Sequence, residues 1–182
     1  GVHTQYMTDG IMELMQRGIV TNRCKGLNEG KTVASAALGS LALYQFLNNH
    51  PAIELHPSDY TNNPAIIAGH NRMVSINFAT SIDLTGQVAA DALPQNHFTG
   101  VTGMADFVEG ALYSPGGKSI IVIHSTTPDG KTSRIVPELD SGSVVVPRTE
   151  VSYLVSEFGA VNLFGKSLQE RAMAMISIMI DE

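Results

Sequence analysis

Apolar residues recur along this chain in two alternating patterns, one with the period of a helix and one typical of a buried strand. After Asp9, apolar residues at positions 11, 12, 14 and 15 follow the helical period, so a helix is predicted there that ends near Gly18. Further helices are predicted at 40–51, with Ser40 as its N-cap and Pro51 as its end, and at 62–70, 103–114 and 166–179, the last with a near capping box of Ser167 and Glu170.

Strand patterns separate these helices. The clearest is 118–126, where four consecutive β-branched residues, Ile120 to Ile123, suit a central strand that is covered on both faces. Other strands are predicted at 31–38, 52–57, 73–84, 142–147 and 151–159, with a hairpin turn at Asp129-Gly130. The alternation predicts an α/β fold: a layered, mostly parallel sheet with flanking helices.

Composition limits the possible classes. With 182 residues, 43% of them hydrophobic, the chain fits a single domain, 1–182, with a real core. Its net charge of -6 argues against a nucleic-acid partner, because neutralising phosphates needs clustered Lys and Arg. The single Cys24 excludes an internal disulfide, and no apolar run has the length of a transmembrane helix. We therefore expect a cytoplasmic protein without a membrane partner.

Short motifs give weak chemical signals. The glycine turns in LTGQV, FTGVTGMADF, SPGGKS and EFGAVNLFGKS could present backbone N–H groups to a ligand, but most such turns only reverse the chain. The dinucleotide and P-loop patterns are absent, and the six histidines lack metal-ligand spacing, so no metal is expected. All histidines except His3 are interpreted as ordinary core or surface residues.

Eight longer stretches are more specific, and they occur in order over nearly the whole chain. They are GVHTQYMTDGIMELMQRGIVTN, DYTNNPAIIA, MVSIN, DLTGQVAAD, GMADFVEGA, GGKSIIVI, SRIVP and SEFGAVNLFGKSLQERA. Together they resemble the C-terminal domain of the acetyl-CoA hydrolase/transferase family, which includes acetate and 4-hydroxybutyrate CoA-transferases. The resemblance implies a CoA-transferase type of domain, with the active site in a cleft shared with an N-terminal domain that this chain lacks. It also implies acyl-CoA and a short carboxylic acid as substrates, coenzyme A as the ligand, and a homo-oligomer at full length.

The family mechanism, by resemblance, begins with a glutamate that attacks the acyl-CoA thioester. This glutamate follows a His-Thr pair, in a pattern like G-[IV]-H-T-E, and the corresponding position here is Gln5. A carboxamide oxygen is a very poor nucleophile because its lone pair is delocalised and it carries no charge. Gln5 is therefore expected to be unable to begin the transferase cycle.

The rest of the site is also assigned by resemblance. Gly100 and Gly103 would offer N–H groups to the thioester oxyanion, and Glu157 would act near the thioester as an acid or base. The residues expected to line the coenzyme A side are Asn62, Gly86, Gln87 and Lys118. Two departures from the family pattern, Ser81 ahead of Asp83 and Thr102 inside the glycine loop, favour natural divergence over a single substitution at Gln5.

Three interpretations remain open at this point. The chain belongs to a CoA-transferase or hydrolase with altered chemistry, or it is a catalytically silent CoA-binding domain. The third is a structural fragment whose cleft does not work without its partner. The transferase or hydrolase interpretation is favoured. The resemblance also implies that Gln5 lies next to Gly100 and Gly103, although nearly a hundred residues separate Gln5 from these glycines.

Overall fold

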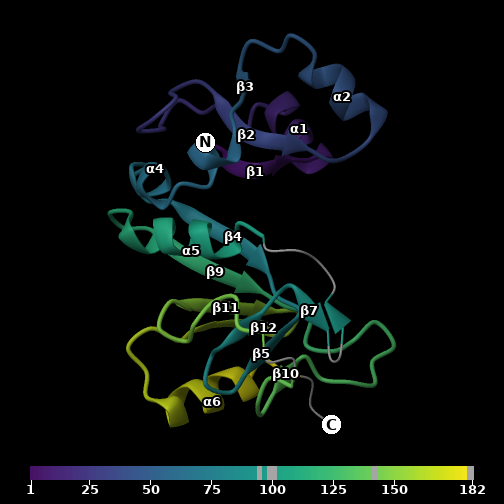
Figure 1. Cartoon of the computed structure of the whole chain (residues 1–182), viewed down its shortest axis with the longest axis vertical. Helices are drawn as coiled ribbons and strands as arrows, with labels where there is room; N and C mark the ends of the chain where they lie inside the picture. The colour runs from purple at the N-terminus through teal and green to yellow at the C-terminus, as the bar shows by residue number, and fades with distance from the viewer. Residues whose placement is uncertain (94–95, 98–101, 141–142, 180–182) are drawn as a thin grey trace.

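The computed structural model describes residues 1–93, 96–97, 102–140 and 143–179 as two stacked parts (Figure 1). The upper part contains a parallel sheet in the order β1-β2-β3, flanked by helices. Its elements are β1 (His3–Met7), α1 (Asp9–Gln16), β2 (Thr32–Ala37), α2 (Leu41–Leu47), β3 (Ile53–Leu55) and α3 (Ser58–Thr61). A small core of Met7, Ala34 and Leu43 joins the sheet to α1 and α2.

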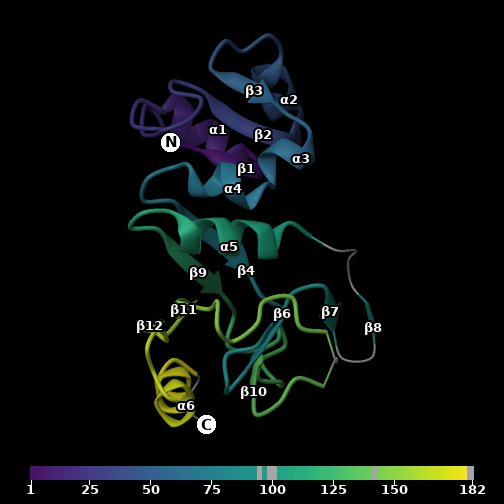
Figure 2. The same cartoon turned by 60° about the vertical axis from the view of Figure 1, so that its left-hand side comes forward.

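The lower part contains a four-stranded sheet in the order β12-β11-β9-β4, parallel except for the β11-β12 pair. The helix α5 packs on β9 and β4 and contacts α4, which links the two parts (Figure 2). The elements are α4 (Pro64–Ala68), β4 (Val74–Phe78), α5 (Met104–Tyr113), β9 (Lys118–Val122), β11 (Tyr153–Ser156), β12 (Gly159–Asn162) and α6 (Leu168–Ile176).

Two smaller sheets complete the lower part. One has the order β10-β5-β6, and the other is the pair β7-β8. Their strands are β5 (Ser81–Asp83), β6 (Val88–Ala89), β7 (Ala92–Leu93), β8 (Asn96–His97) and β10 (Ile135–Val136). A larger core, which includes Ile82, Val108, Ile121, Leu154 and Met175, joins the four-stranded sheet, α5, α6 and β5. No helix of the described residues has the length and apolar character needed to cross a membrane.

The α/β class and the central strand are confirmed. β9 lies between β4 and β11, and Ile121 is fully buried, as predicted for an interior strand. The expected cover on both faces is not found, because Ile120 and Val122 on the other face are only half-buried. The N-cap of α2 is also confirmed, since the Ser40 hydroxyl accepts a hydrogen bond from Leu43 N. Both members of the predicted capping box of α6, Ser167 and Glu170, make its hydrogen bonds.

Other boundaries differ from the prediction. The strands form several separate sheets, and the run 73–84 divides into β4 and β5, which lie in different sheets. The predicted strand at 142–147 is wrong for its described residues, where only Val146 makes an isolated bridge, to Val88. β-Branched residues form a strand only where a neighbouring strand is in reach. α2 ends at Leu47, before Pro51, while α3 and β12 are not predicted at all.

The predicted hairpin turn at Asp129-Gly130 is present, with short arms. Gly130 N donates to Thr127 O at 2.8 Å, and the arms pair in the antiparallel sense through one bridge, Thr126 with Ser133, flanked by the bonds Thr127 N to Thr132 O and Arg134 N to Ser125 O. The chain then continues into β10, which pairs with β5 in parallel. Turn residues therefore fix the local reversal, whereas the partner of the following strand depends on distant residues.

Candidate active site

Gln5 lies on β1 with its side chain directed at the start of α5. Its Oε1 accepts a hydrogen bond from Gly103 N at 3.2 Å, across 98 residues of sequence. Gly103 is the N-cap of α5, where backbone N–H groups carry partial positive charge. The carboxamide of Gln5 therefore lies where an anionic oxygen would be favoured. Gly100, the other glycine expected here, lies outside the described residues.

Asn62 reaches the same point from the end of α3. A Cβ added to Gly103 would lie 2.2 Å from Asn62 Nδ2 and 2.7 Å from Gln5 Oε1, so no other residue fits at position 103 without displacement. Asn62 Oδ1 is buried and has no hydrogen-bond partner among the described residues. Gln5, Gly103 and Asn62 thus form one polar cluster, contributed by β1, α5 and α3.

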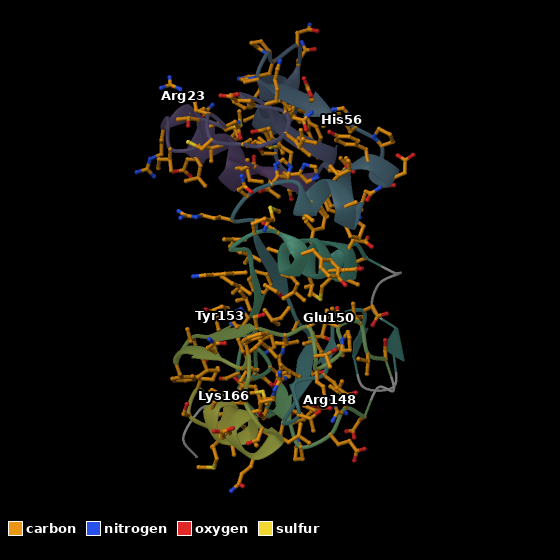
Figure 3. All side chains as sticks on the ribbon, turned by 90° about the vertical axis from the view of Figure 1, so that its left-hand side faces the viewer. Arg23, His56, Arg148, Glu150, Tyr153 and Lys166 are labelled. Atoms are coloured by element: carbon orange, nitrogen blue, oxygen red, sulfur yellow. The ribbon has the colours of Figure 1, made fainter. Side chains whose placement is uncertain are left out.

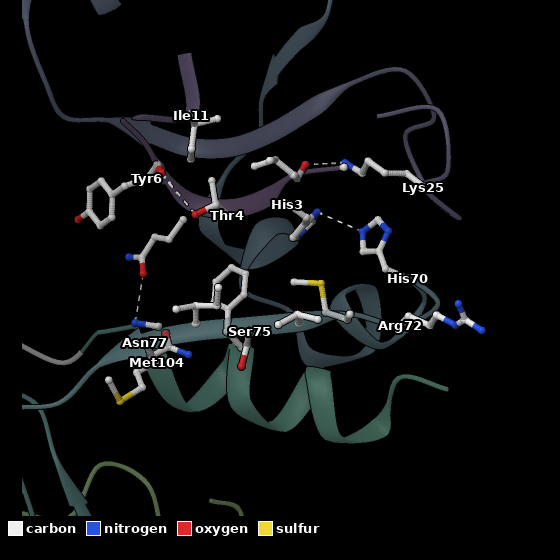
Figure 4. Close-up of a pocket in the computed structure, with 18 of the residues that line it drawn as sticks. His3, Thr4, Tyr6, Ile11, Lys25, His70, Arg72, Ser75, Asn77 and Met104 are labelled. Carbon is white, nitrogen blue, oxygen red and sulfur yellow. Dashed lines mark hydrogen bonds between the residues drawn. The ribbon is translucent and has the colours of Figure 1, made fainter. Parts of the chain in front are cut away.

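A cleft of about 710 Å³ opens beside this cluster, between the upper and lower parts. It is lined by residues 1–6 from the β1 segment, residues 70–77 from the β4 segment, and residues 102–104 and 107 from the α5 segment. Figure 4 shows Thr4 and Tyr6 on one side and Ser75 and Asn77 on the other. Its volume is within the range of small-molecule sites.

The other end of the cleft contains two buried histidines. His3 Nε2 lies 2.8 Å from Thr61 O, and since a carbonyl only accepts, this nitrogen carries the proton. His3 Nδ1 then accepts from His70 Nε2 at 3.3 Å. His70 Nδ1 is left buried without a partner among the described residues. The pair links β1 to the segment that enters β4 (Figure 4).

Burial makes this end of the cleft unfavourable for positive charge. Desolvation lowers the pKa of His70 to about 4, with a further contribution from His3. Desolvation also lowers the pKa of His3. The pKa of Lys25 falls to about 8, again by burial, although Glu54 opposes the shift. Lys25 Nζ donates to Val2 O and Lys31 O, both at 2.8 Å.

The remaining expected site residues have partners away from this cleft. Gln87 Nε2 donates to Asp83 Oδ2 at 2.7 Å. A Cβ at Gly86 would lie 2.7 Å from Arg171 Nη1 of α6 and 3.9 Å from Arg148, which lies in the lower part (Figure 3). Neither Gly86 nor Gln87 lines the cleft.

Lys118 and Glu157 also lie outside the cleft lining. Lys118 Nζ is 5.6 Å from the ring centre of Tyr153, which lies below α5 in Figure 3. The Glu157 carboxylate accepts from Ser125 N at 2.9 Å and from Ser125 Oγ at 2.8 Å. Hydrogen bonds from its own backbone N–H and from Ser125 lower the pKa of Glu157, so the group is ionised at neutral pH.

Sequence reasoning missed the partners of His3. His70 and Thr61 are separated from it by 67 and 58 residues, and no motif spacing connects them. Cys24, by contrast, is free and exposed at the cleft margin. Within the described residues, no group of three or more His, Cys, Asp or Glu side chains could bind a metal ion.

Comparison with known proteins identifies the family of this chain. Residues 39–180 match the model of the acetyl-CoA hydrolase/transferase C-terminal domain. The chain belongs to the acetyl-CoA hydrolase/transferase family. It is 45% identical over 179 residues to a 4-hydroxybutyrate coenzyme A transferase of Clostridium kluyveri, covering 98% of this chain and 42% of that protein. It is 43% identical, also over 179 residues, to a succinyl-CoA:cyclohexane-1-carboxylate CoA transferase of Geobacter metallireducens, covering 98% of this chain and 41% of that protein.

Solved structures of family relatives have the same fold. The crystal structure of RipA from Yersinia pestis superposes with a TM-score of 0.93 at 44% identity, covering 99% of this chain and 41% of that one. A 4-hydroxybutyrate CoA-transferase from Porphyromonas gingivalis gives a TM-score of 0.85 at 42% identity, covering 99% of this chain and 42% of that one. The chain therefore spans about two fifths of the length of the relatives it matches.

Proposed function

We propose that residues 1–182 form the C-terminal domain of an acyl-CoA:carboxylate CoA-transferase or acyl-CoA hydrolase of the acetyl-CoA or 4-hydroxybutyryl-CoA type. The observation that carries the proposal is the hydrogen bond from Gly103 N to Gln5 Oε1 beside the cleft. It brings Gln5, which we assign by resemblance to the position of the family nucleophile, into contact with a backbone donor at a helix N-terminus. The relatives from Clostridium kluyveri and Geobacter metallireducens are both named as CoA transferases, which supports the substrate class.

Each polar group of the cluster has a proposed part in that reaction. The N–H of Gly103, together with that of Gly100, would stabilise the oxyanion formed from the thioester carbonyl, and each such donor is typically worth ~3 kcal/mol. Asn62 Oδ1, buried without a described partner, is available to accept a hydrogen bond from the acyl-CoA. Gln5 occupies the place of the attacking group but lacks the charge for attack.

Coenzyme A contacts are proposed for residues outside the cleft lining as well. Gly86, Gln87 and Lys118 would face the coenzyme A side when the full-length protein closes around its ligand. Glu157 is proposed as a base, because its lowered pKa leaves it ionised and therefore unsuited to donate a proton. We further propose that an N-terminal domain completes the site around this cleft and that the full-length protein is a homo-oligomer.

A catalytically silent CoA-binding domain is the second candidate. Gln5 itself favours it, since a residue that accepts a hydrogen bond from Gly103 and carries no charge can help to bind a carbonyl-containing ligand without reacting. The two candidates share coenzyme A binding and differ only in covalent chemistry. A test of adduct formation therefore separates them.

The first prediction concerns that adduct. The full-length protein is incubated with acetyl-CoA, reduced with borohydride and examined by mass spectrometry. The unaltered protein is expected to form no adduct, whereas Gln5→Glu forms one, because the two side chains are nearly isosteric and only the nucleophilic charge is added. Gln45→Glu, which adds the same charge at an exposed position on α2, is the control and forms none.

Coenzyme A binding is measured in parallel as a rise in Tm with ligand concentration. Binding without an adduct on Gln5→Glu would contradict the transferase proposal and support the silent domain. An adduct on any residue of the unaltered protein other than Gln5 would show that the nucleophile has been misplaced. Absence of any coenzyme A binding would refute both candidates.

A further inference from the structure

Two strands form sheet edges on opposite sides of the cleft. β1 is the first strand in the order β1-β2-β3, and β4 is the last in the order β12-β11-β9-β4. Within the described residues, β1 pairs only with β2, and β4 only with β9. The cleft is lined by residues 1–6 on one side and 73–77 on the other (Figure 4). An edge strand leaves a row of backbone N–H and C=O groups unpaired.

The backbone hydrogen bonds show which groups face the cleft. Met73 O accepts from Lys118 N, and Ala79 N donates to Val122 O, so the odd-numbered residues of β4 bond to β9. Successive backbone groups alternate in direction along a strand, and the N–H and C=O of Ile76 therefore point away from β9, toward the cleft.

The same reasoning applies to β1. Val33 N donates to Val2 O, and His3 is in register with Val33, so residues 2 and 4 bond to β2 at this end of β1. The N–H and C=O of His3 therefore point away from β2, again toward the cleft. Both edges thus present unpaired backbone groups to one shared space.

The sheet next to this space also has an uncovered apolar face. The side chains of Val74, Ile76 and Phe78 are 44%, 64% and 64% exposed, while Ser75, on the opposite face, is buried. Ile120, in register with Ile76, and Val122 are half-buried and continue the same apolar face across β9. The cleft is also apolar on the side of α5, where Met104 and Phe107 line it.

We propose that a β-strand from the part of the full-length protein outside residues 1–182 inserts between β1 and β4 and joins the two sheets. The chain spans 42% and 41% of the two relatives described above, so ample sequence remains to supply such a strand. The inserted strand would contact apolar side chains on both of its faces. We therefore expect it to be rich in Val, Ile or Leu along its whole length, as are strands of sheets that are covered on both sides.

A single inserted strand can form backbone hydrogen bonds with both β1 and β4. A second copy of the chain would pair one edge with its own equivalent and leave the other edge free. A coenzyme A molecule has too few alternating donors and acceptors to replace a ladder of backbone bonds. The inference does not depend on the chemistry of Gln5. The inserted strand would fill the cleft along residues 2–4 and 74–76, and the proposed acyl-CoA site would then be the end of the cleft beside Gln5 and Gly103.

Hydrogen exchange of the full-length protein, without coenzyme A, tests this proposal. The Ile76 and His3 amides are expected to exchange at least roughly 100-fold more slowly than in an unstructured chain, as do amides inside sheets. The reference is Leu55 on β3, the opposite edge of the upper sheet. Its N–H also points outward, because the bonds of Thr32 N to Ala52 O and His56 N to Ala34 O use the even-numbered residues. Leu55 is expected to exchange rapidly.

A matched pair of proline variants of the full-length protein gives a second measurement. Ile76→Pro removes an N–H that the inserted strand would use, and its Tm is expected to fall by roughly 5–10 °C. Leu55→Pro removes an outward N–H at an unpaired edge, where proline is tolerated, and leaves the Tm within about 2 °C. If Ile76→Pro does not fold, exchange in the unaltered protein still decides.

Three results would overturn the proposal. Rapid exchange of Ile76 and His3 in the full-length protein would show that both edges are free. Protection that appears only after coenzyme A is added would assign the space to the ligand. Protection that appears only at high protein concentration would assign it to a second copy. None of these results bears on adduct formation by Gln5→Glu, so this proposal and the proposed function can fail separately.

Discussion

At the scale of single residues, Gly103 shows the tightest steric restriction in the polar cluster. Its missing side chain leaves room for Asn62 Nδ2 and Gln5 Oε1, which would lie 2.2 Å and 2.7 Å from a Cβ at this position. Contacts that close force one of the two amide groups to move. The restriction comes from neighbours contributed by α3 and β1, and not from the backbone conformation of Gly103, whose φ is -76°.

Gly103→Ala is therefore expected to reduce the free energy of unfolding by about 1–3 kcal/mol and to weaken coenzyme A binding, because Gln5 and Asn62 are displaced. Gly10→Ala is the control: in the exposed helix α1, the nearest atom to its added Cβ is Thr8 Oγ1 at 4.0 Å. It should leave stability unchanged or raise it by up to about 1 kcal/mol. Denaturant titration measures both. Equal changes in the free energy of unfolding for the two variants would show that Gln5 and Asn62 can move aside without loss of stability.

At the scale of elements, helix caps decide where several helices begin. α6 starts with a complete capping box, in which Ser167 Oγ accepts from Glu170 N and the Glu170 carboxylate accepts from Ser167 N. α1 starts at Thr8 with no side-chain hydrogen bond at the cap. The two helices thus allow a comparison of a bonded and an unbonded cap in one molecule.

Ser167→Ala is expected to lower the free energy of unfolding by about 1 kcal/mol, since it leaves Glu170 N without its partner. Thr8→Ala, at the unbonded cap, should cost clearly less. Thermal or chemical denaturation of the two variants gives the comparison. A loss at Thr8 as large as that at Ser167 would mean that the capping box contributes nothing beyond local backbone preference.

At the scale of the whole molecule, the His3-His70 pair connects the upper part to the lower one. His70 is 5% exposed, and its pKa is lowered to about 4 from the ordinary value of 6.5. The unfolded chain therefore binds more protons than the native state between pH 6.5 and pH 4, so stability falls as pH falls through this range. The lowered pKa of His3 acts in the same direction.

We expect a loss of up to about 3 kcal/mol from His70 between pH 7 and pH 4, because its pKa lies at about 4 in the folded protein and at 6.5 in the unfolded chain. His70→Asn should reduce this pH dependence, even though it removes a hydrogen bond to His3 and lowers stability at pH 7. His124→Asn, at an exposed position, is the control and should leave the profile unaltered. Urea titrations between pH 4 and pH 7 measure the free energy of unfolding of each variant. A profile for His70→Asn as steep as that of the unaltered protein would contradict the buried-pair explanation.

The sequence by itself determined what depends on neighbours along the chain. The buried strand at Ile121, the caps at Ser40 and Ser167 and the turn at Gly130 follow from local patterns of side-chain burial, capping and backbone freedom. The resemblance of eight stretches also identified the family, which the match over residues 39–180 bears out.

Only the tertiary structure decided which distant groups meet. The division of 73–84 between two sheets, the contact of Gln5 with Gly103, and the pairing of His3 with His70 depend on elements separated by tens of residues. Strand pairing and burial arise from the packing of whole elements, and no period or motif within one segment encodes its partner. For the same physical reason, the unpaired edges of β1 and β4 became visible only when both sheets were seen on opposite sides of one cleft.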